Sequence, residues 1–100
     1  MKHQSIDVPQ EAIAAFCRRN RIRRLSLFGS VLREDFRPDS DIDMLVEFEP
    51  DARVSLFDVG GMMYELTEML GRQVDLRTPA DLSRYFRQQV IADSELLYAA

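Results

Sequence analysis

A glycine–serine pair and two aspartates carry the chemistry that this sequence offers. Gly29-Ser30 ends a run of alternating apolar residues, and Asp41-Ile42-Asp43 follows after ten residues. The backbone N–H groups and the hydroxyl at a strand-to-helix corner can hold phosphate oxygens, because the first amides of a helix have no partner within it. Carboxylates at positions i and i+2 of a strand project from one face and can share a hard cation. A phosphate cradle beside two such carboxylates indicates nucleotide chemistry.

A third acid, Asp75, lies far downstream in a second apolar run, residues 73–77. In that run the neighbours of Asp75 on either side are apolar, and in residues 42–48 the acids also alternate with apolar side chains. Because successive strand residues point to opposite faces, we expect Asp75 to share a face with Asp41 and Asp43, away from the apolar layer.

The elements that must position these residues follow from periodicity and capping signals. We expect helices over residues 9–20, 55–70 and 79–92, and strands over 22–28, 42–48 and 73–77. A short helix through residues 31–33, a turn at residues 37–40 and a terminal segment at residues 96–98, either an edge strand or a helical tail, complete the pattern. This order predicts an α/β (α+β) fold with a small mixed β-sheet of three or four strands and helices packed mainly on one face.

The helix at residues 55–70 carries the clearest local signals. Ser55-x-x-Asp58 is a capping box and Gly71 suits the position after the helix end. We expect an apolar stripe facing the core, made by Leu56, Val59, Met63, Leu66 and Leu70. Gly60-Gly61 costs about 1 kcal/mol per glycine relative to alanine, which predicts a close backbone approach by a strand or a ligand.

The last helix has similar signals at its start. Thr78 is an N-cap, Pro79 suits the first turn and Asp81 the third position. Its expected apolar face is made by Leu82, Tyr85, Phe86 and Val90.

The composition of the chain limits its chemistry. We expect one domain over residues 1–100, and without a run of 18 apolar residues or a signal segment we expect a cytoplasmic protein with no membrane partner. The net charge of −4 argues against stable nucleic-acid binding. Cys17, His3 and Lys2 are the only residues of their types, which excludes disulfides, zinc clusters, histidine-based nucleophile systems and the P-loop lysine. We expect Cys17 to be buried and inert, and Lys2 to lie in a frayed terminus.

Two other acid-based sites do not fit the sequence. In a calcium-binding EF-hand loop that starts at Asp39, the sixth residue must be glycine and the twelfth glutamate, but these are Met44 and Pro50. A phosphoacceptor receiver domain needs a late lysine, and the only lysine is Lys2.

Gly29-Ser30 followed by ten residues and Asp41-Ile42-Asp43 resembles the signature of the DNA polymerase β-like nucleotidyltransferases. The chain is more narrowly similar to minimal nucleotidyltransferases of the MntA type. That similarity covers nearly the whole length and includes Arg33, residues 37–43, the helix start at Leu56 and residues 71–76. The chain departs from the family pattern at Glu34, where glycine is common, and at Arg77, where an apolar residue is common.

The resemblance implies the polymerase β-like fold and a role for each site residue. Gly29 and Ser30 would hold the β- and γ-phosphates of ATP, with Arg33 either supporting the triphosphate or pairing with Asp35 or Asp39. The three acids, Asp41, Asp43 and Asp75, would bind Mg²⁺, with two ions expected, and Asp75 would help to activate the acceptor hydroxyl.

The resemblance also implies a partner. Family members of this size resemble antitoxins that transfer AMP from ATP to a tyrosine of a HEPN-domain ribonuclease toxin. We expect a chain of this length to hold no second lobe for an acceptor, which agrees with an acceptor presented by another protein. Either the arginine cluster at residues 18–24 or the last helix could dock it. Two alternatives stay open: a non-catalytic antitoxin that masks the toxin by binding alone, and a stand-alone transferase that modifies a small molecule.

Overall fold

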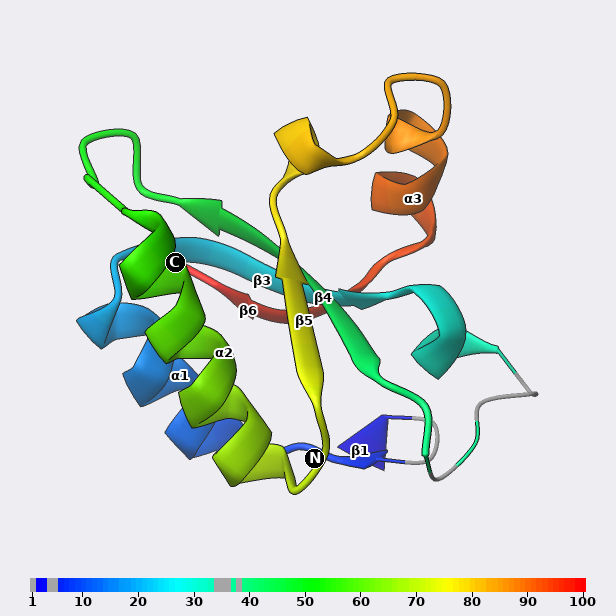
Figure 1. The fold of residues 1–100 in the computed structure, drawn as a ribbon, viewed down its shortest axis with the longest axis horizontal. Coiled ribbons are helices and arrows are strands. Elements are labelled where there is room, and N and C mark those ends of the chain that lie inside the picture. Colours follow the sequence, from blue (N-terminus) through cyan, green and yellow to red (C-terminus); the bar gives the residue numbers. More distant parts are fainter. Residues whose placement is uncertain (1, 4–5, 34–36, 38) are drawn as a thin grey trace.

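The computed structural model describes residues 2–3, 6–33, 37 and 39–100, and its centre is a four-stranded mixed β-sheet (Figure 1). The strand order is β5-β4-β3-β6. Strand β3 is antiparallel to both β4 and β6, whereas β4 and β5 are parallel. The bounds are β3 (Ile22–Phe28), β4 (Ile42–Phe48), β5 (Val74–Arg77) and β6 (Glu95–Ala99). The expected mixed sheet is confirmed, and the tail at residues 96–98 is an edge strand.

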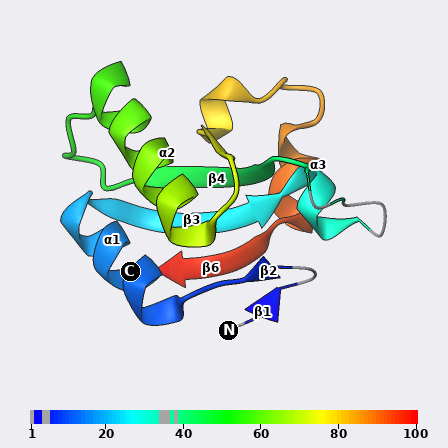
Figure 2. The ribbon, with the colours of Figure 1, turned by 60° about the horizontal axis from the view of Figure 1, so that its bottom comes forward.

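Helices α1 (Gln10–Arg19) and α2 (Leu56–Leu70) lie side by side on one face of this sheet (Figures 1 and 2). Their apolar stripes and the facing strand residues form one continuous core, in which Phe16, Leu25, Met44 and Leu66 are fully buried. Since strand residues alternate between faces, the positions between these apolar ones project from the opposite face. That face carries Asp43 and Asp75.

Helix α2 begins and ends as its capping signals predict. The Ser55 hydroxyl accepts a hydrogen bond from the Asp58 amide, while the Asp58 carboxylate accepts one from the Ser55 amide. Gly71 closes the helix in the left-handed conformation, with φ of 72°. Both signals are therefore confirmed.

The predicted core stripe of α2 is wrong at its first position. Leu56 is 90% exposed, and Met62, which the prediction left out, is buried beside Leu66. At about 100° per residue, Leu56 stands roughly 80° around the helix from Leu66, so it points past the rim of the core.

The prediction of a close approach to Gly60 and Gly61 by a strand is also wrong. A Cβ atom added at either glycine would meet no atom within 4 Å. Nothing in the described part of the chain therefore uses the space that these two glycines leave open.

The helix expected over residues 79–92 is broken into two pieces. A 3-10 turn, η2 (Pro79–Asp81), is followed by a connecting segment and then by α3 (Arg87–Asp93). The Thr78 capping box caps the start of the short turn only, because the backbone at Leu82 is extended, with ψ of 146°, and ends the turn there. The chain then turns again at Ser83, whose carbonyl accepts a hydrogen bond from the Phe86 amide. The expected apolar face is lost, and Tyr85 and Phe86 are exposed.

The N-terminus is more ordered than expected. Strands β1 (Lys2–His3) and β2 (Ile6–Asp7) form a short antiparallel ribbon in which Lys2 pairs with Asp7, so the expected frayed terminus is wrong. Cys17 is buried as predicted, and burial raises the pKa of its thiol to about 12. No helix in the described ranges is long and apolar enough to cross a membrane.

Candidate active site

The Gly29-Ser30 corner stands at the end of β3, where the chain enters the 3-10 turn η1 (Gly29–Leu32). Gly29 has φ of 76°, which an L side chain adopts only with strain. A Cβ atom added at Gly29 would lie 2.5 Å from Oδ2 of Asp43. The corner therefore requires glycine both for its backbone conformation and for the approach of the Asp43 carboxylate.

The pairing of the strands brings two of the three predicted acids together. Asp43 of β4 is directly opposite Asp75 of the parallel strand β5, and on its other side it is opposite Phe28 of β3. Asp41 lies just before β4 and is exposed. Asp43, Asp75 and the Gly-Ser corner thus meet at one end of the sheet, on the face that α1 and α2 leave uncovered, and Asp41 is near enough for its charge to act on Asp43.

Asp43 is the electrostatic centre of this group. Burial raises the pKa of its carboxyl group above the ordinary value, and the charges of Asp75 and Asp41 raise it further. Arg77 and the Ser30 amide lower the same pKa, but they do not cancel the increase. The site is therefore a place where negative charge is costly and where a cation would be stabilising.

The Ser30 amide lies close enough to the Asp43 carboxylate to lower its pKa. This N–H was expected to bind a phosphate oxygen. In the structure it already acts on a negative charge at the corner, which is compatible with that role.

Arg77 forms an ion pair with Asp75 inside the acid group. Both Nε and Nη2 of Arg77 lie 3.1 Å from Oδ2 of Asp75. In the sequence, Arg77 stands out only as a departure from the family pattern, and its pairing with Asp75 was not predicted. The i, i+2 spacing along the strand was the signal that could have revealed it.

The donor set fits a hard divalent cation, although the acids are not arranged as a complete metal centre. Within residues 6–33, 37 and 39–100, no three His, Cys, Asp or Glu side chains form a group that could hold a metal ion. Asp43 and Asp75 offer oxygen ligands on neighbouring strands, and the guanidinium of Arg77 already provides positive charge there. Mg²⁺ prefers oxygen ligands, and its charge would relieve the repulsion between these two carboxylates.

The other candidate residues surround this centre. Arg33 is exposed at the end of η1, and its amide donates to the Ser30 carbonyl at 3.0 Å. Its possible partner Asp35 and the departure at Glu34 lie outside the described residues. The turn at residues 37–40 is confirmed, because the Ser40 amide donates to the Arg37 carbonyl at 3.0 Å and the Ser40 hydroxyl accepts from the Arg37 amide.

Two pockets flank the candidate site. One, of about 550 Å³, is lined by Phe28, Gly29, Leu32, Arg33, Val90 and Asp93. The other, of about 540 Å³, extends from Asp75 and Arg77 over the apolar side chains of Leu76, Val59 and Met63. The first pocket therefore adjoins the Gly-Ser corner, and the second adjoins Asp75.

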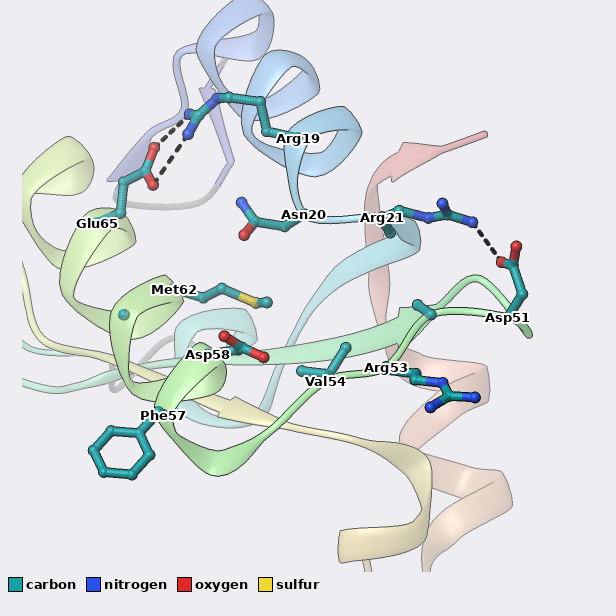
Figure 3. A pocket seen from close by; sticks show the side chains of 12 residues that line it. Arg19, Asn20, Arg21, Asp51, Arg53, Val54, Phe57, Asp58, Met62 and Glu65 are labelled. Atoms are coloured by element: carbon teal, nitrogen blue, oxygen red, sulfur yellow. Dashed lines mark hydrogen bonds and ion pairs between the residues drawn. The ribbon is translucent and has the colours of Figure 1, made fainter.

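A third pocket, shown in Figure 3, lies at the opposite end of the sheet from the acids. Part of the arginine cluster lines it, and these arginines are paired: Arg19 with Glu65 at 2.5 Å and Arg21 with Asp51 at 2.5 Å. Arg23 similarly lies 3.7 Å from Glu47. Arg19, Arg21 and Arg23 of the cluster are therefore paired with acidic residues of the same chain.

Known proteins share both the sequence and the fold. A curated relative from Methanocaldococcus jannaschii, named "Putative protein adenylyltransferase MJ0435", is 36% identical over 73% of this chain and 76% of its own length. A solved "putative minimal nucleotidyltransferase" is 35% identical, with a TM-score of 0.70 and 85% of both chains covered.

Two toxin–antitoxin complexes contain chains of the same fold at lower identity. One, solved with AMP-PNP, has a TM-score of 0.72 at 23% identity, covering 93% of this chain and 75% of that one. The other is the tri-AMPylated HEPN toxin of Shewanella oneidensis in complex with its MNT antitoxin. Its matching chain has a TM-score of 0.64 at 24% identity, covering 91% of this chain and 70% of that one.

The family model described as "Nucleotidyltransferase domain" matches residues 10–98, a range that contains the Gly-Ser corner and all three acids. With this match and the curated relatives of the protein adenylyltransferase group, the chain belongs to the nucleotidyltransferase domain family and is a nucleotidyltransferase.

Proposed function

We propose that residues 1–100 act as one minimal domain that transfers AMP from ATP to a tyrosine hydroxyl of a HEPN-type toxin in the cytoplasm, as its antitoxin. The observation that carries this proposal is the position of Asp43, directly opposite Asp75 and in contact with the Gly29-Ser30 corner. The solved complexes with AMP-PNP and with an AMPylated HEPN toxin support the choice of ATP and of the partner.

In this proposal, the corner holds the triphosphate. The Ser30 amide donates to a phosphate oxygen, with the Ser30 hydroxyl and the Gly29 amide beside it. Arg33, at the exposed end of the same turn, adds positive charge for the terminal phosphates. The α-phosphate then lies over the acids.

Asp41, Asp43 and Asp75 would hold Mg²⁺, with two ions expected, and the metal would stabilise the negative charge that develops on the reacting phosphate. Asp75 lies on the edge strand, where an acceptor can approach, and its carboxylate receives the proton of the tyrosine hydroxyl. The tyrosine oxygen forms a bond to the α-phosphorus, the bond to the bridging oxygen breaks, and pyrophosphate leaves. Arg77 keeps the Asp75 carboxylate in place before the substrates bind.

Incubation of the chain with the protein encoded by the neighbouring gene, ATP and Mg²⁺ tests the proposal. We expect mass spectrometry to find added AMP on a tyrosine of that protein, and Asp43→Asn and Asp75→Asn to abolish the addition. Asp58→Asn is a matched control, because Asp58 is an acid of the α2 capping box outside the site. Neutralisation of the toxin by Asp43→Asn without AMP transfer would instead support an antitoxin that acts by binding alone.

A further inference from the structure

The outward face of α2 carries aromatic side chains and glycines where a solvated helix usually carries charges. Phe57 is 93% exposed and Tyr64 is 69% exposed, with Gly60 and Gly61 between them and Glu68 in the last turn. At about 100° per residue, Phe57, Tyr64 and Glu68 fall opposite the buried side of the helix. In Figure 3 the Phe57 ring points away from the pocket at the end of the sheet.

Packing within the described residues does not explain this stripe. Glycine destabilises a helix interior, and two in succession persist when the space beside them is used. A Cβ atom on Gly60 or Gly61 would nevertheless meet no atom of this chain within 4 Å. The open space and the two exposed aromatic rings together point to another helix that packs against α2.

The stripe is self-complementary about the Gly60-Gly61 midpoint. Phe57 and Tyr64 lie at equal distances along the helix on either side of it. If two copies of α2 cross antiparallel about a two-fold axis at this midpoint, Phe57 of one copy faces Tyr64 of the other. Glu68, in the last turn of one copy, then lies beside the N-terminal end of the other helix.

We propose that α2 is the interface between two copies of this chain, which cross antiparallel at Gly60 and Gly61. The glycines allow the two helix backbones to approach closely, and the aromatic rings on either side exclude water from the contact. The antiparallel helix dipoles select this orientation, because the negative Glu68 of each copy lies beside the positive N-terminal end of the other helix. The interface lies on the helix layer, so it leaves the acids on the other face of the sheet uncovered.

The mass of the chain in solution tests self-association. Sedimentation velocity and light scattering over a wide concentration range should find twice the chain mass of 11.6 kDa. Phe57→Glu and Tyr64→Glu should each give monomers, because they bury a charge at the crossing. Tyr85→Glu and Phe86→Glu, which change exposed aromatic side chains on the other side of the sheet, should leave the dimer intact. A wild-type chain that is monomeric at all concentrations, or a dimer that survives Phe57→Glu, overturns the proposal.

Cysteine pairs test the orientation. Positions 57 and 64 of one helix are about 10.5 Å apart along its axis, too far for a disulfide within one chain. The double variant Phe57→Cys/Tyr64→Cys should therefore form a disulfide-linked dimer on oxidation, while Phe57→Cys alone should not. Linkage by Phe57→Cys alone would mean a parallel pair and would overturn the proposed crossing. Cys17 is buried and does not compete.

Discussion

Asp43 and Asp75 face each other directly across two parallel strands, so the backbone pairing of β4 and β5 holds two carboxylates together. Burial raises the pKa of Asp43, and the charge of Asp75 raises it further. Like charges on adjacent strands are destabilising. A cation bound between the two carboxylates would remove this repulsion.

The repulsion at Asp43 predicts an unusual dependence of stability on pH. Its folded-state pKa is raised above 3.8, so the ionised carboxylate opposes folding at neutral pH, and this penalty disappears as pH falls through the folded pKa towards 3.8. In the absence of metal, Asp43→Asn should unfold at a higher urea concentration than wild type at pH 7, with the difference vanishing under acid.

Asp51→Asn serves as the control for this pH series. Arg21 holds the pKa of the exposed Asp51 carboxyl below its ordinary value, so this variant should be no more stable than wild type at pH 7. If both variants shifted the urea midpoint in the same direction, charge repulsion would not be the cause.

Mg²⁺ should stabilise the folded chain through the same acids. A ligand present at a hundred times its Kd stabilises by about 2.7 kcal/mol, which corresponds to a rise of roughly 10 °C or more in Tm for a domain of this size. We expect this rise for wild type in a calorimetric scan, and little change for Asp43→Asn or Asp75→Asn. An equal rise in all three proteins would place the cation elsewhere.

Arg77 should act as an internal counter-charge that competes with metal. Its guanidinium pairs with Asp75 and lowers the pKa of Asp43. Since the pair is partly exposed and worth about 0.4–1 kcal/mol, Arg77→Ala should tighten Mg²⁺ binding by roughly twofold to fivefold. Isothermal titration of the metal measures the affinity.

The matched control for this titration is Arg84→Ala. Arg84 stacks on the exposed ring of Tyr85, with 5.1 Å from its guanidinium carbon to the ring centroid, and makes no contact with the acids. Weaker binding by Arg77→Ala than by the control would mean that Arg77 supports the metal site by holding the Asp75 carboxylate in position, and that it does not compete with the metal.

Local signals predicted the parts of the fold that depend on neighbouring residues. The strands at residues 22–28 and 42–48 have the predicted bounds, because apolar side chains at every second position, Leu25 and Leu27 in the first and Ile42, Met44 and Val46 in the second, are buried on one face. The caps at Ser55 and Gly71 are likewise local in origin. Parity then placed Asp75 on the face of Asp43, although only strand pairing could reveal that the two are directly opposite.

The features that were predicted wrongly or not predicted depend on contacts between distant parts of the chain. The exposure of Leu56 depends on where the sheet ends beneath α2, and the break in the helix expected over residues 79–92 depends on how the chain crosses to the other face. The close approach of Gly29 to the Asp43 carboxylate joins a 3-10 turn to a neighbouring strand, so neither residue's own segment could predict it.

Gly29 and Gly71 form a matched pair that separates backbone strain from site geometry. Both have positive φ, 76° and 72°, but an added Cβ would approach the Asp43 carboxylate at Gly29 and meet no atom within 4 Å at Gly71. Either substitution by alanine should cost about 1–2 kcal/mol in the free energy of unfolding, because both force an L side chain into the left-handed region. The Asp43 carboxylate can rotate away from the new methyl group, so the additional effect at Gly29 should be a change in the geometry of the site. Urea unfolding should therefore give similar losses of stability for the two variants. Titration should find weakened Mg²⁺ binding only for Gly29→Ala. Equal metal affinity in the two variants would mean that the close approach of Gly29 to Asp43 has no part in positioning the ligand.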